Sequence, residues 1–222
     1  MIEPGHEDPV SDGGDPDGAF FLDRSSALDA DGGSLLVGDG SGCFHVGESG
    51  VDDCGDTLLV NADFNRSLAG WVSGDAFGTI AWDPHDSQSA RASGSVAVTN
   101  NYDVPDDGEC TAVAAQCVPA TPGARYAFGA DVFIPRGQDY GAAALDVVFY
   151  DQEGCTGASQ AAYTAATTDV VGRWVRLPEP SAVWAWTTSK SMSVRLGAQK
   201  PFRNGPVEIL FDAVRVTKVD AG

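Results

Sequence analysis

The sequence is poor in basic residues, and this deficit limits what the protein can bind. Its 222 residues include 13 Lys and Arg against 32 Asp and Glu, which gives a formal net charge of −19 at pH 7. A chain with this charge repels nucleic acids and anionic lipid, and no basic stripe in the sequence offsets that repulsion. We therefore expect no nucleic-acid partner.

Long apolar runs are absent as well. No stretch approaches the roughly 18 apolar residues of a membrane-spanning helix, so we expect no membrane insertion. Residues 1–6 lack the basic and apolar parts of a signal peptide. We therefore expect either a trimmed chain or an export route whose signal lies outside these residues.

Helical periodicity is also missing. No segment sustains a 3.6-residue apolar period, and the nearest is the Ala- and Thr-rich segment 157–168. From residue 58 on, turn-forming residues separate short apolar or alternating runs, which predicts an all-β sandwich or jelly roll of two antiparallel sheets. The expected strands are 57–60, 78–82, 95–98, 117–118, 125–134, 143–150, 174–177, 191–196 and 207–218.

Histidine is scarce, and this limits the catalytic readings. His6, His45 and His85 have no Cys or His partner at zinc-ligand spacing. A Ser-His-Asp triad would have to use His85, which lies in a predicted turn, Asp83-Pro84-His85-Asp86. A glycosidase pair of carboxylates stays open because Asp and Glu are abundant. We expect no enzyme, and an extracellular hydrolase is the second alternative.

The acidic residues gather at the N-terminus. Residues 1–57 hold 14 Asp and Glu against Arg24 alone, which is a net −13 of the total −19. Such a segment has little apolar surface to offset its ordering entropy. We expect residues 1–57 to form a mostly irregular acidic arm or linker, followed by one β-sandwich domain over residues 58–219.

Alternation predicts which side chains face the core. In segment 126–134 the odd and even positions separate into two faces, as they do in segment 145–150. Phe64, Trp71, Trp174 and Phe211 are expected to be core residues rather than contact residues. The predicted inward residues are Tyr126, Phe128, Ala130, Val132, Ile134, Leu145, Val147 and Phe149, and Asp146, Val148 and Tyr150 are predicted to face the other way.

Two motifs stand at the ends of region 58–219. Asn61-Ala62-Asp63-Phe64-Asn65, followed by Gly70-Trp71, opens the region, and Phe211-Asp212-Ala213-Val214-Arg215-Val216 closes it. Both motifs resemble those of the carbohydrate-binding modules of the CenC type, which are galactose-binding-like jelly rolls attached to secreted polysaccharide-degrading enzymes. The resemblance implies a jelly-roll β-sandwich with a non-catalytic role in binding polysaccharide.

Five cysteines are typical of an oxidising compartment, and the odd number leaves one without a partner. Spacing alone allows Cys110 to pair with Cys117, just as it allows Cys43 to pair with Cys54. Similar jelly rolls carry a Cys-Val-x-x-x-Pro-Gly-x-x-Tyr strand entry and a later Cys-x-Gly, and this chain reproduces both. The resemblance therefore implies a Cys117–Cys155 bridge, with Cys43–Cys54 inside the arm and Cys110 free.

The resemblance also implies a structural calcium ion. In similar modules the ion joins the opening motif, a loop before a Ser-Gly-Ser strand, and the Asp of the closing strand. The matching positions are Asp63 or Asn65, the loop 87–91, and Asp212. Mixed side-chain and carbonyl oxygens are the ligands that Ca²⁺ prefers. A hydrogen-bonded Asp212 without a metal ion is the alternative.

Aromatic residues supply the candidate sugar site. The flat C–H faces of pyranose rings pack on aromatic rings, while sugar hydroxyls form hydrogen bonds with polar side chains. Trp184 and Trp186 alternate, so both point to one side, although they could instead fill the core. The predicted ligand-binding residues are Trp82, Tyr102, Tyr140, Trp184 and Trp186.

Together these features predict a secreted or cell-surface, non-catalytic domain that binds polysaccharide or glycan. The first alternative is a structural or adhesion β-sandwich without a sugar site. An exposed Trp patch in a groove would favour the glycan-binding function, and a convex polar surface would favour the structural or adhesion domain.

Overall fold

The computed structural model describes residues 44–45, 52–53, 57–74, 77–88, 93–103, 108–177 and 182–219. Strands β1 (Phe44–His45) and β2 (Asp52–Asp53) pair with each other in antiparallel orientation. Most of the predicted acidic arm and the predicted Cys43–Cys54 bridge lie outside the described residues. The arm and its boundary at residue 57 therefore stay predictions.

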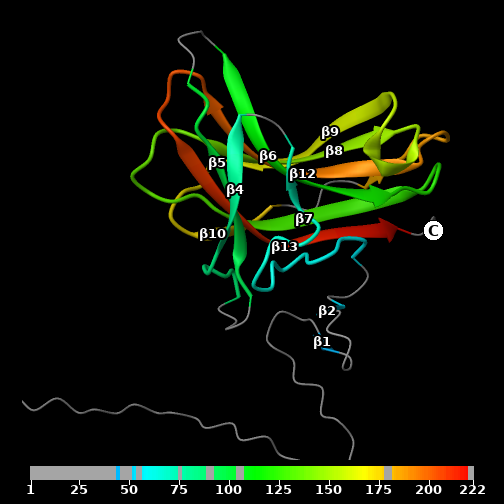
Figure 1. The fold of residues 1–222 in the computed structure, drawn as a ribbon, viewed down its shortest axis with the longest axis horizontal. Coiled ribbons are helices and arrows are strands. Elements are labelled where there is room, and N and C mark those ends of the chain that lie inside the picture. The colour runs from blue at the N-terminus through cyan, green and yellow to red at the C-terminus, as the bar shows by residue number, and fades with distance from the viewer. Residues whose placement is uncertain are drawn as a thin grey trace, which may run out of the picture. The chain divides into compact units, whose positions relative to one another are not determined.

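The domain is a sandwich of two antiparallel sheets, as the sequence predicted (Figure 1). The five-stranded sheet has the order β3 (Val72–Ser73), β6 (Glu109–Pro119), β12 (Ser191–Pro201), β8 (Ala142–Tyr150) and β9 (Ser159–Thr168). The six-stranded sheet has the order β10 (Trp174–Arg176), β7 (Arg125–Phe133), β13 (Val207–Val219), β5 (Ser95–Asn100) and β4 (Gly78–Asp83), with β11 (Val183–Trp184) also paired to β7.

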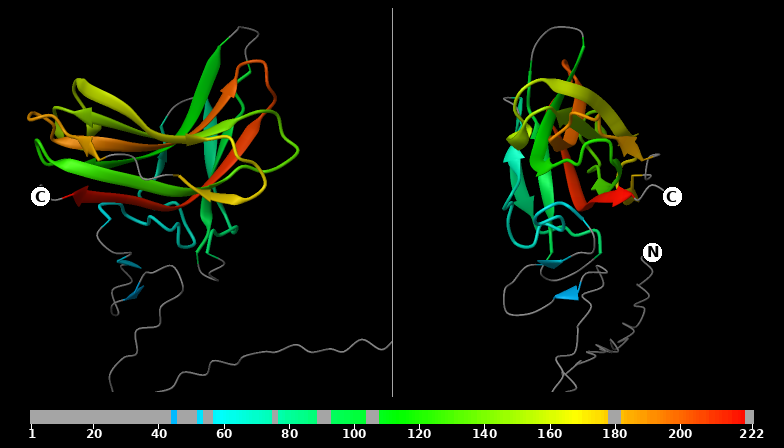
Figure 2. Two further views of the ribbon diagram at one scale, coloured as in Figure 1. Left: turned by 180° about the vertical axis from the view of Figure 1, so that it is seen from behind. Right: turned by 90° about the vertical axis from the view of Figure 1, so that its right-hand side faces the viewer.

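Figure 2 shows the two layers from the side, with β8, β9 and β12 lying over β7 and β13. A short 3₁₀ turn, η1 (Glu153–Cys155), is the only helical element among the described residues. None of the described segments forms a helix long and apolar enough to cross a membrane.

The core fills the space between the inward faces of the two sheets, and the predicted alternation is confirmed. Leu145, Val147 and Phe149 on β8 are fully buried, and Tyr126 and Phe128 on β7 are 1% exposed. Large apolar side chains alternate with outward residues on both strands, so burial of one face fixes the register.

One core prediction was wrong. Phe64, Trp71 and Phe211 are buried as expected, but Trp174 is only partly buried. Trp174 pairs in register with Phe133, which points outward because its neighbour Val132 faces the core. The two rings pack on the outer face of the six-stranded sheet with centroids 5.6 Å apart.

The opening and closing motifs lie side by side, as the sequence predicted. The amide of Leu58 donates to the carbonyl of Val216 at 2.8 Å, and the amide of Val214 donates to that of Ala62 at 3.0 Å. Segment 57–60 is irregular rather than the expected strand. It occupies the edge of β13 beyond residue 211, where the ladder with β5 ends.

The Cys117–Cys155 bridge is confirmed. It joins β6 to the η1 turn, and the two cysteines are 38 positions apart in the sequence. Cys110 is a free and buried thiol, so pairing of Cys110 with Cys117 is excluded. The bridge ties the end of β6 to the connection between β8 and β9.

Candidate functional site

The structure brings only two of the five predicted aromatic residues together. Trp184 and Trp186 occupy one short extended segment, whereas Trp82, Tyr102 and Tyr140 lie on β4, after β5 and in the β7–β8 connection. The five residues therefore do not form a single binding surface.

Trp184 and Trp186 are surface residues, so the alternative that they fill the core is excluded. Their exposed fractions are 55% and 53%, while the intervening Ala185 is buried. Trp184 pairs with Arg125 on β7, and the ladder continues because Ala185 N donates to the carbonyl of Ala124 at 2.9 Å. This alternation turns both indole rings to the outer side of the six-stranded sheet.

The backbone around Trp186 is held by hydrogen bonds. Trp186 N donates to Ser189 Oγ at 3.1 Å, and Ser189 N donates back to the carbonyl of Trp186 at 3.0 Å. The amide of Gly123 also donates to that carbonyl at 3.2 Å. Ser189 is fully buried, so an exposed ring rests on a fixed backbone.

A shallow hollow of about 230 Å³ lies beside Trp184. The Pro122-Gly123 turn forms its floor, and Gly123 adopts φ 71°, a left-handed conformation that favours glycine. A Cβ atom at Gly123 would meet no atom within 4 Å. The hollow is lined by Thr121, Pro122, Gly123, Ala124, Arg125, Trp184, Lys218 and Val219.

Trp82 has a different environment. Its indole Nε1 donates to the carbonyl of Phe64 at 2.7 Å, and the side chain is 37% exposed. A Cβ atom on Gly94 would lie 2.7 Å from the six-membered ring. Trp82 therefore fastens the opening motif to β4, with one part of its ring exposed.

Tyr102 and Tyr140 lie apart from the Trp184 segment. The Tyr102 ring contacts Phe77 and Phe202 edge-on, with centroids 4.5 and 5.8 Å away. Tyr140 is 59% exposed, and its carbonyl accepts a hydrogen bond from Asn204 at 3.0 Å. Tyr102 is thus a member of an aromatic cluster, and Tyr140 is a solitary surface ring.

A polar cluster on the outer face of the five-stranded sheet was missed by the sequence reasoning. Arg195 Nη2 donates to the Tyr150 hydroxyl at 3.0 Å, and Arg195 faces Asp146 directly across the β12–β8 ladder. Two hollows of about 320 and 200 Å³ border Arg195. Alternation had placed Asp146 and Tyr150 on this face, but the pairing with β12 was not predictable from it.

The surroundings of Asp146 in this cluster oppose ionisation of its carboxyl group. Burial raises the pKa of its carboxyl above the usual range, while the Thr164 side chain and the Arg195 charge act in the opposite direction. Its Oδ1 atom is buried and has no hydrogen-bond partner among the described residues. The cluster therefore holds a buried carboxylate oxygen that no described residue satisfies, next to the hollow that Asp146 lines.

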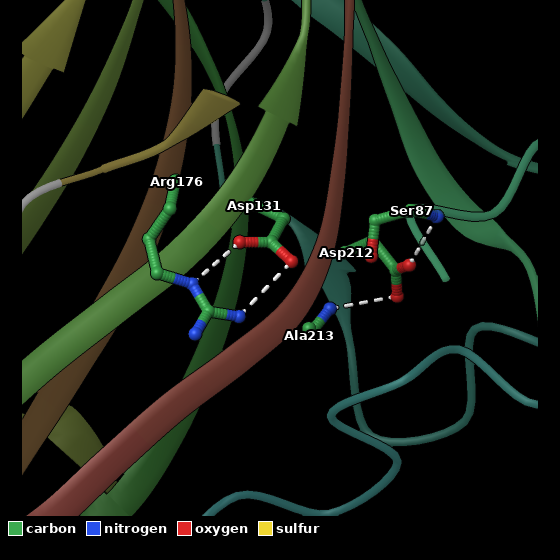
Figure 3. Close-up of polar contacts among 5 residues, drawn as sticks. All are labelled: Ser87, Asp131, Arg176, Asp212 and Ala213. Atoms are coloured by element: carbon green, nitrogen blue, oxygen red, sulfur yellow. Dashed lines mark hydrogen bonds and ion pairs between the residues drawn. The ribbon is translucent and has the colours of Figure 1, made fainter. Parts of the chain in front are cut away.

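Asp212 is the centre of the predicted cation site (Figure 3). It is 1% exposed, and its two carboxylate oxygens accept the amides of Ser87 at 2.9 Å and Ala213 at 2.7 Å. Burial raises the pKa of Asp212 to about 7, the hydrogen bonds from Ser87 and Ala213 lower it, and the Asp86 charge raises it further.

No cation of the described chain balances Asp212. Its cross-strand neighbour Asp131 is neutralised by Arg176, with N–O distances of 2.8 and 3.1 Å, as Figure 3 shows. Asp86 Oδ2 is buried and has no hydrogen-bond partner among the described residues. A buried carboxylate beside a partly buried one, with no cation of the described residues between them, forms surroundings in which a bound metal ion would relieve like-charge repulsion.

The donor set fits a hard cation only in part. In the parts of the chain that the structure describes, no three His, Cys, Asp or Glu side chains gather in one place. An ion here would need carbonyl or hydroxyl oxygens as well, as calcium accepts. Asp63 is buried and its carbonyl accepts the Ser93 hydroxyl at 2.7 Å, so the opening motif reaches this region. Asn65 is partly exposed.

The catalytic candidates find little support in the geometry. His85 lies in the predicted turn, where its amide and its Nδ1 both contact Asp83 Oδ1 at 2.8 and 2.6 Å. A hollow of about 650 Å³ beside the Cys117–Cys155 bridge has Glu153 as its only carboxylate. This hollow, the one beside Trp184 and the two beside Arg195 are each lined by at most one carboxylate of the described residues.

Comparison with known proteins identifies the fold alone. No protein-family model matches the chain, and no curated protein sequence matches it either. One solved structure with a similar fold is the enzymatically active domain of tailspike protein 4 of bacteriophage CBA120, with a TM-score of 0.51 and 14% identity over 74% of this chain and 22% of that one.

Two further structures come from Clostridium thermocellum. The CBM22-1 and GH10 modules of endo-1,4-beta-D-xylanase 10B, complexed with xylohexaose, give a TM-score of 0.54 and 18% identity over 75% of this chain and 29% of that one. The C-terminal family 22 carbohydrate-binding module of that xylanase gives 0.51 and 15% over 71% of this chain and 90% of that one.

The chain thus spans less than a third of the tailspike and two-module xylanase structures, but nearly the whole of the isolated module. At these identities the likeness establishes a β-sandwich of the kind found in carbohydrate-binding modules. The finer CenC-type assignment stays a prediction.

Proposed function

We propose that the sandwich is a non-catalytic carbohydrate-binding module of a secreted or cell-surface protein, and that it holds polysaccharide by aromatic stacking. The observation that carries this proposal is the pair Trp184 and Trp186, each more than half exposed, on one side of a fixed extended segment. Exposed rings on a rigid backbone lose little conformational entropy when a sugar packs on them.

The polar cluster around Arg195 is a second surface for the same function. Arg195, Tyr150 and Asp146 present donors and acceptors beside two hollows, which suits the hydroxyl groups of a sugar. Val72, which is 60% exposed, lines one of these hollows and offers an apolar contact there. Trp82, Tyr102 and Tyr140 would then act separately from the Trp184 segment.

We propose in addition that a calcium ion stabilises the fold at Asp212 and Asp86, with oxygen ligands from the segment around Asp63. The raised pKa of Asp212, caused by burial, and the unpartnered Asp86 Oδ2 support this proposal. The ion would neutralise the buried carboxylates and join the opening loop to β13. The ion would have a structural role and would not contact the sugar.

A structural or adhesion domain is the competing function, and an extracellular hydrolase is the second. The adhesion reading requires Trp184 and Trp186 to be unimportant for glycan binding. The hydrolase reading requires a pair of carboxylates around a substrate pocket. Both readings are separated from the proposal by measurements on the intact chain.

The test is affinity electrophoresis of the full chain in gels containing neutral polysaccharides such as xylan, galactan and β-glucan. We expect retardation by at least one of them, and loss of retardation in Trp184→Ala and Trp186→Ala with unchanged melting temperature. Trp174→Ala is the matched control, because it removes a partly exposed ring at a different place on the sheet. If no polysaccharide retards the wild type, the adhesion reading replaces this proposal. Equal retardation of all variants would show that the sugar binds away from Trp184 and Trp186 and would refute their role in stacking.

A further inference from the structure

The tryptophan end of the sandwich, which we define as Arg125, Trp184, Trp186, Lys218 and the Thr121–Ala124 turn, carries positive charge in a strongly acidic protein. Arg125 lies with its guanidinium carbon 5.1 Å from the centroid of the Trp184 ring. Lys218 lines the same hollow. With a chain net charge of −19, cations beside exposed aromatic rings call for a specific explanation.

Neither Arg125 nor Lys218 forms an ion pair with a carboxylate of the described residues. Arg125 Nε is buried and makes no hydrogen bond to any described residue. Lys218 Nζ has one long contact, 3.5 Å to the Thr121 hydroxyl. By contrast, Arg176 is paired with Asp131, and Arg195 donates to the Tyr150 hydroxyl.

The Arg125 guanidinium keeps donors for a ligand. Nε is the one guanidinium nitrogen that is buried without a partner among the described residues. The terminal N–H groups of an arginine can bind a carboxylate through two parallel hydrogen bonds. A sugar that packs on the free parts of Trp184 and Trp186 would place its substituents beside Arg125 and Lys218, which no carboxylate of the described residues neutralises.

We propose that the tryptophan end binds acidic polysaccharide, with Trp184 and Trp186 as the stacking platform and Arg125 and Lys218 as partners for the carboxylate of a uronic acid unit. This inference rests on the proposed function and narrows its ligand class. A uronate carboxylate can bind the terminal N–H groups of Arg125 and neutralise its charge, whereas a neutral sugar leaves that charge unbalanced. The open space over Gly123 admits a substituent larger than a hydroxyl.

The experiment compares three polyuronates, polygalacturonate, alginate and glucuronoxylan, with their carboxyl-reduced neutral counterparts. Binding to the full chain is measured by isothermal titration calorimetry in EDTA, which prevents calcium from linking carboxylates, and well below the melting temperature in that buffer. We expect at least one polyuronate to bind about tenfold more tightly than its neutral counterpart, which corresponds to about 1.4 kcal/mol. The preference should shrink between about 0.01 M and 1 M salt, where the Debye length falls from roughly 30 to 3 Å.

Charge-matched variants locate the effect. Arg125→Gln should remove most of the preference for the carboxylated form over the neutral form, and Lys218→Gln should remove part of it. Arg136→Gln removes the same charge from the connection after β7, at the other end of that strand, and should leave the preference intact. Because the two arginine variants have equal net charge, general repulsion by the acidic protein cancels in the comparison.

The outcomes separate this inference from the proposed function. Equal affinity for carboxylated and neutral polysaccharides, or a preference that survives Arg125→Gln, overturns the uronate assignment and leaves glycan binding in place. Tighter binding of a sulfated polysaccharide than of the carboxylated one assigns the cations to sulfate and also overturns it. Absence of binding to every polysaccharide, charged or neutral, refutes both proposals.

Discussion

Replacing Asp212 by Asn should remove the pH dependence that this one carboxyl imposes on stability. The pKa of Asp212 rises from 3.8 to about 7 in the folded protein, chiefly because of burial. The folded state therefore holds a proton that the unfolded state has released between these two pH values, so stability falls as pH rises through that window. A shift of about 3 units corresponds to about 4 kcal/mol at pH above 7.

The amide in Asp212→Asn cannot ionise, so the variant avoids this cost. It loses one of the two hydrogen bonds from Ser87 N and Ala213 N, because the amide nitrogen cannot accept, at a cost of about 1 kcal/mol. In EDTA the variant should be about 1 kcal/mol less stable than the wild type near pH 4 and about 3 kcal/mol more stable above pH 7. The curves of unfolding free energy against pH should therefore cross.

Calcium should nearly cancel this difference at neutral pH. A cation at Asp212 and Asp86 favours the ionised carboxyl, and at 100 times its dissociation constant it would add about 2.7 kcal/mol to the wild type. Asp212→Asn should gain much less. The assay is urea unfolding at a series of pH values, with EDTA and with calcium. Burial also raises the pKa of Asp146, and the difference in unfolding free energy between the two proteins removes the contribution of such groups. Parallel curves in EDTA would refute the buried, unbalanced carboxylate, and an equal calcium response in both proteins would remove the ion from Asp212.

Two further predictions concern the framework. Replacing both Cys117 and Cys155 by Ala should lower the unfolding free energy by about 3 to 4 kcal/mol, because the bridge closes a loop of 38 residues in sequence; urea unfolding would measure it, and a loss below about 1 kcal/mol would contradict the chain-entropy argument. Asn100→Ala should cost about 2 to 4 kcal/mol, because the fully buried Asn100 amide donates to the carbonyls of Cys110 at 3.1 Å and Ala198 at 2.8 Å, and both would lose their partner. A neutral effect in Asn100→Ala would mean that water replaces the amide.

The sheets could be predicted where apolar and polar residues alternate. β7 and β8 show this contrast, and their inward faces were assigned correctly. β9 is rich in Ala and Thr, so its two faces differ little in hydropathy, and it was not predicted as a strand. β6 was predicted only over residues 117–118. Its first half contains small residues, and their strand conformation depends on pairing with the neighbouring strand β12.

The sites were less predictable because they depend on pairing between distant strands. The sequence left open whether Trp184 is exposed or fills the core, and its position over Arg125 depends on the register between β11 and β7, 59 residues apart. The contact of Arg195 with Tyr150 depends in the same way on the β12–β8 register. Local pattern gives the face on which a residue lies, and long-range register decides what it meets there.

The two candidate surfaces lie on opposite faces of the sandwich, and this separates their contributions. Trp184 is on the outer side of the six-stranded sheet, whereas Arg195 is on the outer side of the five-stranded sheet, with the core between them. Substitutions on the two faces share no partner, so their effects on binding should add when both faces bind. If both faces do bind, the protein presents two independent sites to two polysaccharide chains and can link them, which a one-faced module cannot do.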